Sequence, residues 1–358
     1  MGPTNTGMLT KSPMPEKAAF IVSLDLELYW GVRFVRGLEQ CRERLLQVRP
    51  AITRILELFQ EYDIHATWAG VGFLFFQNRD ELLEGLPAVK PDYDPRYFSP
   101  YDGLPHIGRN EAEDPFHYGP SILRAILDTR HQEIATHTFS HYYCLEDGQT
   151  EEAFRSDLEA ALRAAVRWKL DLRSLVFPCN QVNANYLELL RRLGIQSYRG
   201  AGSHWIYRER KRSEESWLRR GVRLLDAYLN LSGHHTVGFD EIRPGPPYNF
   251  PASRLLRPYW HALRMFEPLR LERISAGLEE AARKGRIYHL WFHPEDLAMD
   301  MEQNLKALKT VLSRYAALRE QGRMESVNMG ELSARLLARE PQAEAGEAAP
   351  ACALAASR

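Results

Sequence analysis

The sequence has few cysteines, no excess of charge of one sign and no long uninterrupted hydrophobic run. Its four cysteines are scattered over 358 residues without a C-x-x-C pair, which argues against a disulfide framework and a structural zinc knuckle. The 46 basic and 47 acidic side chains nearly cancel, so no overall field attracts nucleic acid or an anionic membrane. No apolar run could span a bilayer, and the polar, proline-bearing start lacks the apolar centre of a signal peptide. These absences predict a soluble, cytoplasmic protein that binds no nucleic acid.

The composition changes along the chain and suggests one folded domain between two loose ends. Residues 1–17 are polar, and residues 338–358 are rich in alanine and acidic side chains, so both ends are expected to be disordered. Between them, residues 18–337 alternate strand-like and helix-like segments. With 44% hydrophobic residues, this region can bury a substantial core without disulfides. We therefore predict a single α/β domain.

Two acidic side chains follow the first apolar segment of this region. Residues 18–24 are continuously apolar, as in a strand of a parallel sheet that is buried on both faces. Asp25 and Glu27 come directly after it. A single acid at this place would be interpreted as a helix cap. Two acids at the carboxyl end of a parallel strand indicate a site, because α/β folds place their chemistry there.

A pair of histidines follows a second short apolar strand. Residues 134–136 lead into His137 and His141, which would lie on one face if the chain turned helical there. Both imidazoles could then bind one cation. A catalytic zinc takes three protein ligands and leaves a position for water, so a third ligand must come from elsewhere. A late strand, residues 287–292, ends at His293 on the same side as Asp25.

Three other segments have distinctive compositions. Residues 76–118 form a long insertion rich in proline and aromatic residues, and such loops usually form lids or binding walls. The basic run 208–212 is interpreted as a solvated loop. Residues 254–266 mix arginines with large apolar groups, and we interpret them as a helix packed on the domain with its arginines outward, in preference to a membrane-surface helix.

The chain resembles the polysaccharide deacetylase family (NodB homology, carbohydrate esterase 4) in the order and spacing of five motifs over roughly residues 18–337. These motifs are Asp25-Leu26-Glu27, Ala66-Thr67-Trp68, HTFSH at 137–141, Phe177-Pro178-x-Asn180-Gln181, and LWFHP with His293. The resemblance implies a distorted (β/α)7-type barrel with long inserted loops. It also implies one divalent metal ion, usually Zn²⁺, at the carboxyl ends of the strands.

The resemblance also implies an activity and a role for each matching residue. Metal-activated water would remove an N-acetyl group from an amino sugar or glycan intermediate. Asp25 would be the general base and His293 the general acid. The metal ligands would be Glu27, His137 and His141.

This sequence departs from the family pattern at two positions. Leu26 stands where a second aspartate is common, which leaves the roles of Asp25 and Glu27 exchangeable. Cys179 stands where an arginine normally orients the base by a bidentate contact. We expect a substitute arginine beside Asp25, and the candidates are Arg33, Arg199 and Arg223.

Three alternatives remain open at this point. The chain could be a metal-free amidohydrolase of cyclic ureides or imides, or a non-catalytic carbohydrate-binding homologue. Cys179 could act as a nucleophile, although no histidine lies near it in the sequence. Three tryptophans near the strand ends would either stack on a sugar ring or belong to the core: Trp30, Trp68 and Trp291.

Overall fold

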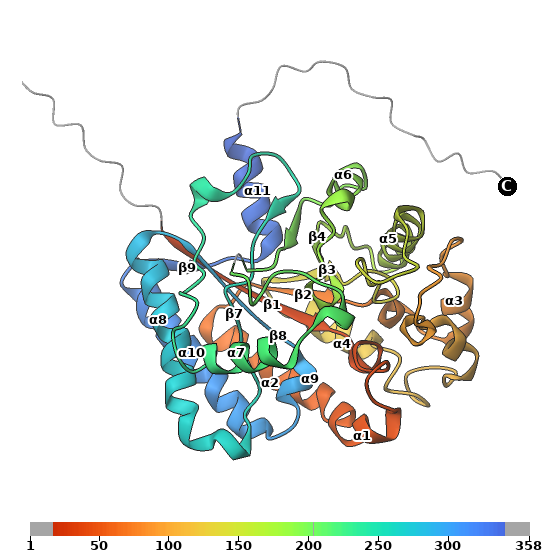
Figure 1. Ribbon diagram of the computed structural model, residues 1–358, viewed down its shortest axis with the longest axis horizontal. Helices are drawn as coiled ribbons and strands as arrows, with labels where there is room; N and C mark the ends of the chain where they lie inside the picture. The colour runs from red at the N-terminus through yellow and green to blue at the C-terminus, as the bar shows by residue number, and fades with distance from the viewer. Residues whose placement is uncertain (1–16, 203, 341–358) are drawn as a thin grey trace, which may run out of the picture.

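The computed structural model describes residues 17–202 and 204–340, which form a curled parallel sheet surrounded by helices (Figure 1). The sheet order is β6-β5-β4-β3-β2-β1-β8-β7, with β9 beside the start of β1, and every strand pair is parallel. The strands are β1 (Ala18–Leu26), β2 (Ala66–Gly70), β3 (Gln132–Thr136), β4 (Ser174–Val176), β5 (Ser197–Arg199), β6 (Tyr248–Asn249), β7 (Arg254–Leu255), β8 (Ile287–Phe292) and β9 (Met324–Ser326).

Residues 248–256 join the two edges of the sheet. The backbone N–H of Phe250 donates to the carbonyl of Tyr198 in β5 at 2.9 Å. Three residues later, the N–H of Ser253 donates to the carbonyl of His289 in β8 at 2.8 Å. One segment therefore continues the hydrogen bonding from β5 to β8. The predicted distorted (β/α) barrel is confirmed.

The first strand lies inside the sheet between two other strands, which suits its largely apolar sequence. All residues of β1 are buried, and the strand is hydrogen-bonded to β2 on one side and to β8 on the other. Parallel strands that are covered by helices outside and by side chains inside need no polar face. The carboxyl ends of β1, β3 and β8 consequently meet at one end of the barrel, where Asp25, His137 and His293 were expected.

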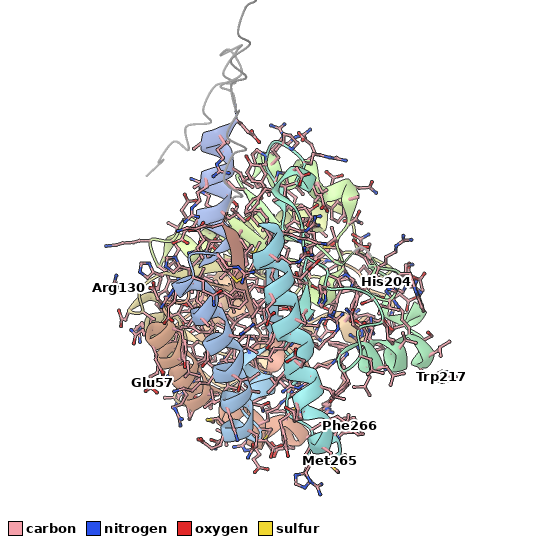
Figure 2. The ribbon with its side chains drawn as sticks, turned by 90° about the vertical axis from the view of Figure 1, so that its left-hand side faces the viewer. Glu57, Arg130, His204, Trp217, Met265 and Phe266 are labelled. Atoms are coloured by element: carbon pink, nitrogen blue, oxygen red, sulfur yellow. The ribbon has the colours of Figure 1, made fainter. Side chains whose placement is uncertain are left out.

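The helices cover the outside of the sheet, with α8 and α10 running alongside each other (Figure 2). The helices are α1 (Leu38–Leu46), α2 (Val48–Tyr62), α3 (Arg79–Glu84), α4 (Pro120–Leu127), α5 (Glu151–Val166), α6 (Leu187–Arg192), α7 (Trp217–Asp226), α8 (Glu267–Lys284), α9 (Pro294–Leu297), α10 (Met301–Glu320) and α11 (Met329–Arg339). Residues 38–62 form two consecutive helices, α1 and α2, with a break at Gln47. Pro50 explains the break, since its ring cannot follow an uninterrupted helix and is tolerated in a first turn.

The prediction for residues 254–266 is wrong. This segment contains β7, an irregular stretch and the 3-10 helix His261–Phe266, and no α-helix packed on the barrel. Arg254 points inward and pairs with the buried Asp226 at 2.6 Å, whereas Trp260 is exposed. Among the described helices, none has the length and apolar character needed to cross a membrane. The expected disorder of residues 1–17 and 338–358 falls mostly outside the described residues, and α11 extends to Arg339.

Candidate active site

The two acidic side chains after β1 point into the same end of the barrel. Asp25 is the eighth residue of β1 and Glu27 follows its last residue, so the alternation of a strand turns both to one face. Both are buried, with 3% and 7% of their surfaces exposed. The side chain of Glu295, just after β8, accepts the backbone N–H of Glu27 at 3.0 Å and of Leu28 at 2.6 Å. Glu295 thereby fixes the backbone that carries Glu27.

The histidine motif is a loop, so the condition of a helical turn, under which the two histidines would share one face, is not met. Thr138 and His141 have φ angles of 63° and 58°, and these left-handed residues reverse the chain sharply after β3. The buried carboxylate of Asp157 in α5 holds the reversal, accepting from the N–H of Phe139 at 2.7 Å and of Ser140 at 3.2 Å. The reversal brings the rings of His137 and His141 to 5.1 Å between centroids.

The structure places Glu27, and not Asp25, against both histidines. Oε1 of Glu27 lies 2.9 Å from Nε2 of His137 and 3.1 Å from Nε2 of His141. Although burial alone would raise the pKa of Glu27, the surrounding histidines hold it well below its usual range. Glu27 is therefore ionised. Asp25, Glu27 and His293 form a neighbouring group of possible ligands.

This arrangement fits a metal cation. Nδ1 of His137 lies 2.9 Å from the carbonyl of Val176, and it must carry a proton to bond to that carbonyl. In the neutral tautomer with this proton, Nε2 would present a lone pair to the carboxylate of Glu27, and two such atoms repel unless a cation lies between them. His141 is buried, and its Nδ1 has no partner among the described residues. Imidazole nitrogen and carboxylate oxygen are ligands that zinc prefers.

An arginine from a different strand stands beside Asp25. Arg199, the last residue of β5, donates from Nη1 to Oδ1 of Asp25 at 2.6 Å and from Nη2 to Oδ2 at 2.7 Å. Burial would raise the pKa of Asp25, but Arg199 and the nearby histidines lower it instead. The expectation of a substitute arginine is confirmed. Of the other two candidates, Arg33 binds backbone carbonyls of residues 97–99, and Arg223 pairs with Glu215 at 2.9 Å.

Arg199 is itself held by a chain of hydrogen bonds that the sequence did not suggest. Its Nη1 donates to Oγ of Ser23 at 3.0 Å, and Ser23 lies 2.8 Å from Nε2 of His289. Burial and the charge of Arg199 lower the pKa of His289 to about 3, so that ring is neutral and accepts from Ser23. Trp291 covers the guanidinium at 4.3 Å. Oδ1 of Asn180 also accepts from Nε and Nη2 of Arg199, at 3.2 Å and 3.0 Å, so several contacts together hold the guanidinium against Asp25.

His293 lies between the two acids. Its Nε2 is 3.7 Å from Glu27 and 3.8 Å from Asp25, and its Nδ1 is 3.2 Å from Asp296. Burial alone would lower the pKa of His293, but these three carboxylates outweigh it and raise the value to about 10. The ring is therefore a proton donor at neutral pH. The sequence reasoning did not identify Glu295 and Asp296 as site residues. They directly follow His293-Pro294, and their acidic character was the signal that could have identified them.

The remaining candidate residues, three tryptophans and a cysteine, lie either in the hydrophobic core or in the cleft that contains the site. Trp30 and Trp68 are buried and belong to the core, so only Trp291 of the three tryptophans is available at the site. Cys179 is exposed in the cleft beside His141. Among the described residues, only Arg212 reaches its sulfur, at 3.6 Å from Nη1. A cysteine nucleophile would need an adjacent base, so this arrangement does not support that role.

Asp157 makes the stability of the site dependent on pH. Burial raises the pKa of Asp157 to about 7, despite its hydrogen bonds from the histidine loop. The folded protein therefore holds this proton more tightly than the unfolded chain does. This contribution to stability is complete below the unfolded pKa near 3.8 and is lost as pH rises toward 7. For Asp157→Asn, we expect the change in unfolding free energy between pH 5 and pH 8 to shrink by about 2 kcal/mol.

Urea unfolding followed by circular dichroism, with chelator present throughout, measures this difference. Asp240→Asn removes an exposed carboxylate and is the matched control. An identical pH dependence of the parent protein and Asp157→Asn would contradict the assignment.

Residues 47–198 match the model of a protein family described as polysaccharide deacetylase. A search of curated proteins found no significant match. The matched region contains His137 and His141, and it ends one residue before Arg199. Asp25, Glu27 and His293 lie outside it, so their assignment depends on the geometry described above.

Solved structures share the fold over most of both chains. A protein named as a polysaccharide deacetylase from Mycobacterium smegmatis has a TM-score of 0.58 at 14% identity, covering 92% of this chain and 93% of its own. PuuE allantoinase has a TM-score of 0.56 at 11% identity, covering 93% of this chain and 96% of its own. A protein named as a polysaccharide deacetylase from Pseudomonas aeruginosa has a TM-score of 0.53 at 10% identity, covering 90% of this chain and 91% of its own. The family match, within a barrel of this fold, confirms the predicted resemblance to the polysaccharide deacetylases, which are hydrolases of amide C–N bonds.

Proposed function

We propose that the chain is a metal-dependent deacetylase that removes the N-acetyl group from an amino sugar or a glycan intermediate. The observation that carries the proposal is the convergence of two separate acid groups at one end of the barrel. Glu27 faces two histidines, while Asp25 is held by an arginine. Glu27 thus lies among residues of the types that bind metal ions, and Asp25 is oriented so that it can act as a general base. Amide hydrolysis by metal-activated water requires both a metal site and a base.

Each residue has a role that its surroundings support. Glu27, His137 and His141 would hold a divalent cation, which we propose to be zinc. When bound, it would activate water and polarise the amide carbonyl. Asp25 is ionised and can accept a proton from the attacking water, with Arg199 fixing its direction. His293 lies between the acids and can donate a proton to the departing amine.

The test is release of acetate from a panel of N-acetylated sugars by protein saturated with zinc, cobalt or manganese in parallel. We expect turnover with at least one metal and none after chelation. Cyclic ureides and imides are included as substrates in the same panel. Ureide hydrolysis that survives complete metal removal would replace this proposal with the metal-free amidohydrolase.

The three cysteines in the described residues are free, which suits a reducing compartment, and we propose a cytoplasmic location.

Binding of the sugar without turnover at any metal content would indicate the non-catalytic homologue. Activity in any arm of the panel would exclude that alternative.

A further inference from the structure

The cleft that contains the candidate active site also carries a group of basic side chains. The cavity has a volume of about 560 Å³ and extends from Asp25, Glu27 and His141 to α7 and the loop before it. A second cavity of about 290 Å³ shares Cys179, Arg223 and Trp291 with it. The basic residues contributed to the first cavity by this loop, by α7 and by the segment after β7 are Arg210, Lys211, Arg212, Arg220, Arg223 and Arg257.

The positive charge is a local feature of this part of the chain. Residues 208–223 contain seven basic and three acidic side chains, although the whole protein has a net charge of only −1. The sequence suggested a solvated loop for 208–212, but its Arg210, Lys211 and Arg212 line the cleft. The expected loop is present, and three of its side chains face the cleft.

Several of these arginines have no acidic partner. The guanidinium groups of Arg210, Arg220 and Arg257 make no hydrogen bond or ion pair with any residue that the structure describes. Among the described residues, the guanidinium of Arg212 contacts the sulfur of Cys179 and the ring of Phe34, whose centroid lies at 4.4 Å, and it has no carboxylate partner. Glu215, a carboxylate of this segment that lines the cleft, is already shared by Arg219 and Arg223.

The position of Arg257 makes this lack of a partner significant. Its side chain is half-buried, and burial together with Arg223 and Arg254 lowers its pKa. A guanidinium remains charged under these conditions, so Arg257 brings to the cleft a positive charge that no carboxylate of the described residues pairs. Guanidinium groups bind phosphate oxygens in pairs, and several of them together suit a ligand with more than one negative charge.

We infer that the substrate is an N-acetylated amino sugar carrying a phosphate or pyrophosphate group. The inference rests on the proposed function, and it adds the chemical class of the substrate. The acetamido group would face Asp25 and Glu27 while the phosphate oxygens bind Arg212, Arg220 and Arg257. Cys179 is consistent with this arrangement, because its small side chain borders both the catalytic residues and Arg212.

The phosphate could belong to a sugar nucleotide or to a lipid carrier, and the outer face of α7 motivates testing both. This helix presents Arg220 and Arg223 to the cleft and buries Arg219. Its opposite side is apolar and exposed, with 84% of Trp217 and 57% of Leu218 accessible. Figure 2 shows Trp217 at the edge of the molecule.

The experiment compares kcat/KM of the metal-loaded protein for four substrates. These are N-acetylglucosamine 1-phosphate, its uridine diphosphate derivative, a polyprenyl diphosphate derivative in detergent, and a neutral N-acetylglucosamine oligomer. We expect the phosphorylated substrates to exceed the neutral one by about 100-fold or more, since each charged contact is worth a factor of about ten. The nucleotide and lipid arms identify the source of the phosphate.

Two variants test whether the preference for phosphorylated substrates depends on the arginines of the cleft. Arg220→Gln and Arg257→Gln should each reduce the ratio of phosphorylated to neutral kcat/KM by about tenfold, mainly through KM. Arg264→Gln removes an exposed arginine outside the cleft and should leave the ratio unchanged. Added inorganic pyrophosphate should inhibit competitively, and less strongly in both cleft variants.

The outcomes separate this inference from the proposed function. Equal turnover of neutral and phosphorylated sugars, with a ratio that neither cleft variant changes, would overturn the phosphate inference and leave the deacetylase intact. Calorimetric binding of pyrophosphate that needs Arg257, without deacetylation of any substrate, would retain the anion site and overturn the deacetylase. Neither turnover nor pyrophosphate binding would overturn both.

Discussion

Replacing Arg199 by glutamine is expected to lower kcat/KM for deacetylation by about 10²- to 10⁴-fold, the range for loss of a positioned general base. Asp25 would lose both hydrogen bonds that set its direction and the charge that keeps it ionised in a buried site. The pH at which activity rises should move upward. Steady-state kinetics from pH 5 to pH 9 measures both effects.

Controls for Arg199→Gln separate orientation from general damage. Arg199→Lys keeps the charge but not the bidentate contact, so we expect an intermediate loss. Metal content should remain near that of the parent protein, because Arg199 contacts none of the proposed ligands. Full activity of Arg199→Gln, with its fold and metal intact, would show that Asp25 does not need this arginine.

Loss of folding is the main competing explanation, and the pairing of Arg199 with Asp25 allows it to be tested. Removing one partner of a buried ion pair costs about 3–5 kcal/mol, whereas removing both charges costs less. Asp25→Asn combined with Arg199→Gln should therefore be more stable than Arg199→Gln alone. Cys179→Arg should give no gain in activity, since Arg199 already occupies both oxygens of Asp25.

Replacing Glu27 by glutamine is expected to reduce bound metal from about one equivalent to less than about a tenth, since a neutral amide is a poor zinc ligand. Activity should fall with it, by more than about 10³-fold. Glutamine preserves the size of the side chain, so the effect reports the charge. Elemental analysis of protein purified without chelator gives the stoichiometry.

The matched variant Asp25→Asn decides between the two acids. It should lose activity but keep its metal, because Asp25 faces Arg199 and Glu27 faces the histidines. Glu331→Gln, which removes a carboxylate paired with His65 away from the site, should keep both metal and activity. Metal loss in Asp25→Asn, with retention in Glu27→Gln, would exchange their roles.

The residues that could be predicted from the sequence are those whose signal is local. Asp25 and Glu27 stand out because they end an apolar strand, and His137 and His141 because of their spacing. The shape of the histidine loop could not be predicted in the same way. Thr138 is β-branched and gives no indication of a left-handed φ, which is maintained here by the buried carboxylate of Asp157.

Contacts between strands that are not neighbours in the sheet could not be predicted from the sequence for a related reason. β5 is separated from β1 by β4, β3 and β2 in the sheet, so Arg199 meets Asp25 only after the sheet has curled. Several arginines were equally plausible before that closure was known. The same limit explains the error at residues 254–266, where Arg254 turns inward to Asp226, a partner nearly thirty residues earlier in the chain.

The arrival of Arg199 from β5 has a consequence for how catalytic competence is judged among related chains. The resemblance implies a guanidinium on the loop after β4, whereas Asp25 here receives both hydrogen bonds from Arg199 of β5. The loop after β4 is thereby relieved of orienting the base, and a small residue such as Cys179 becomes acceptable there. A rule that requires arginine at the position of Cys179 would class this chain as inactive. A rule that requires a guanidinium within reach of the base would class it as complete.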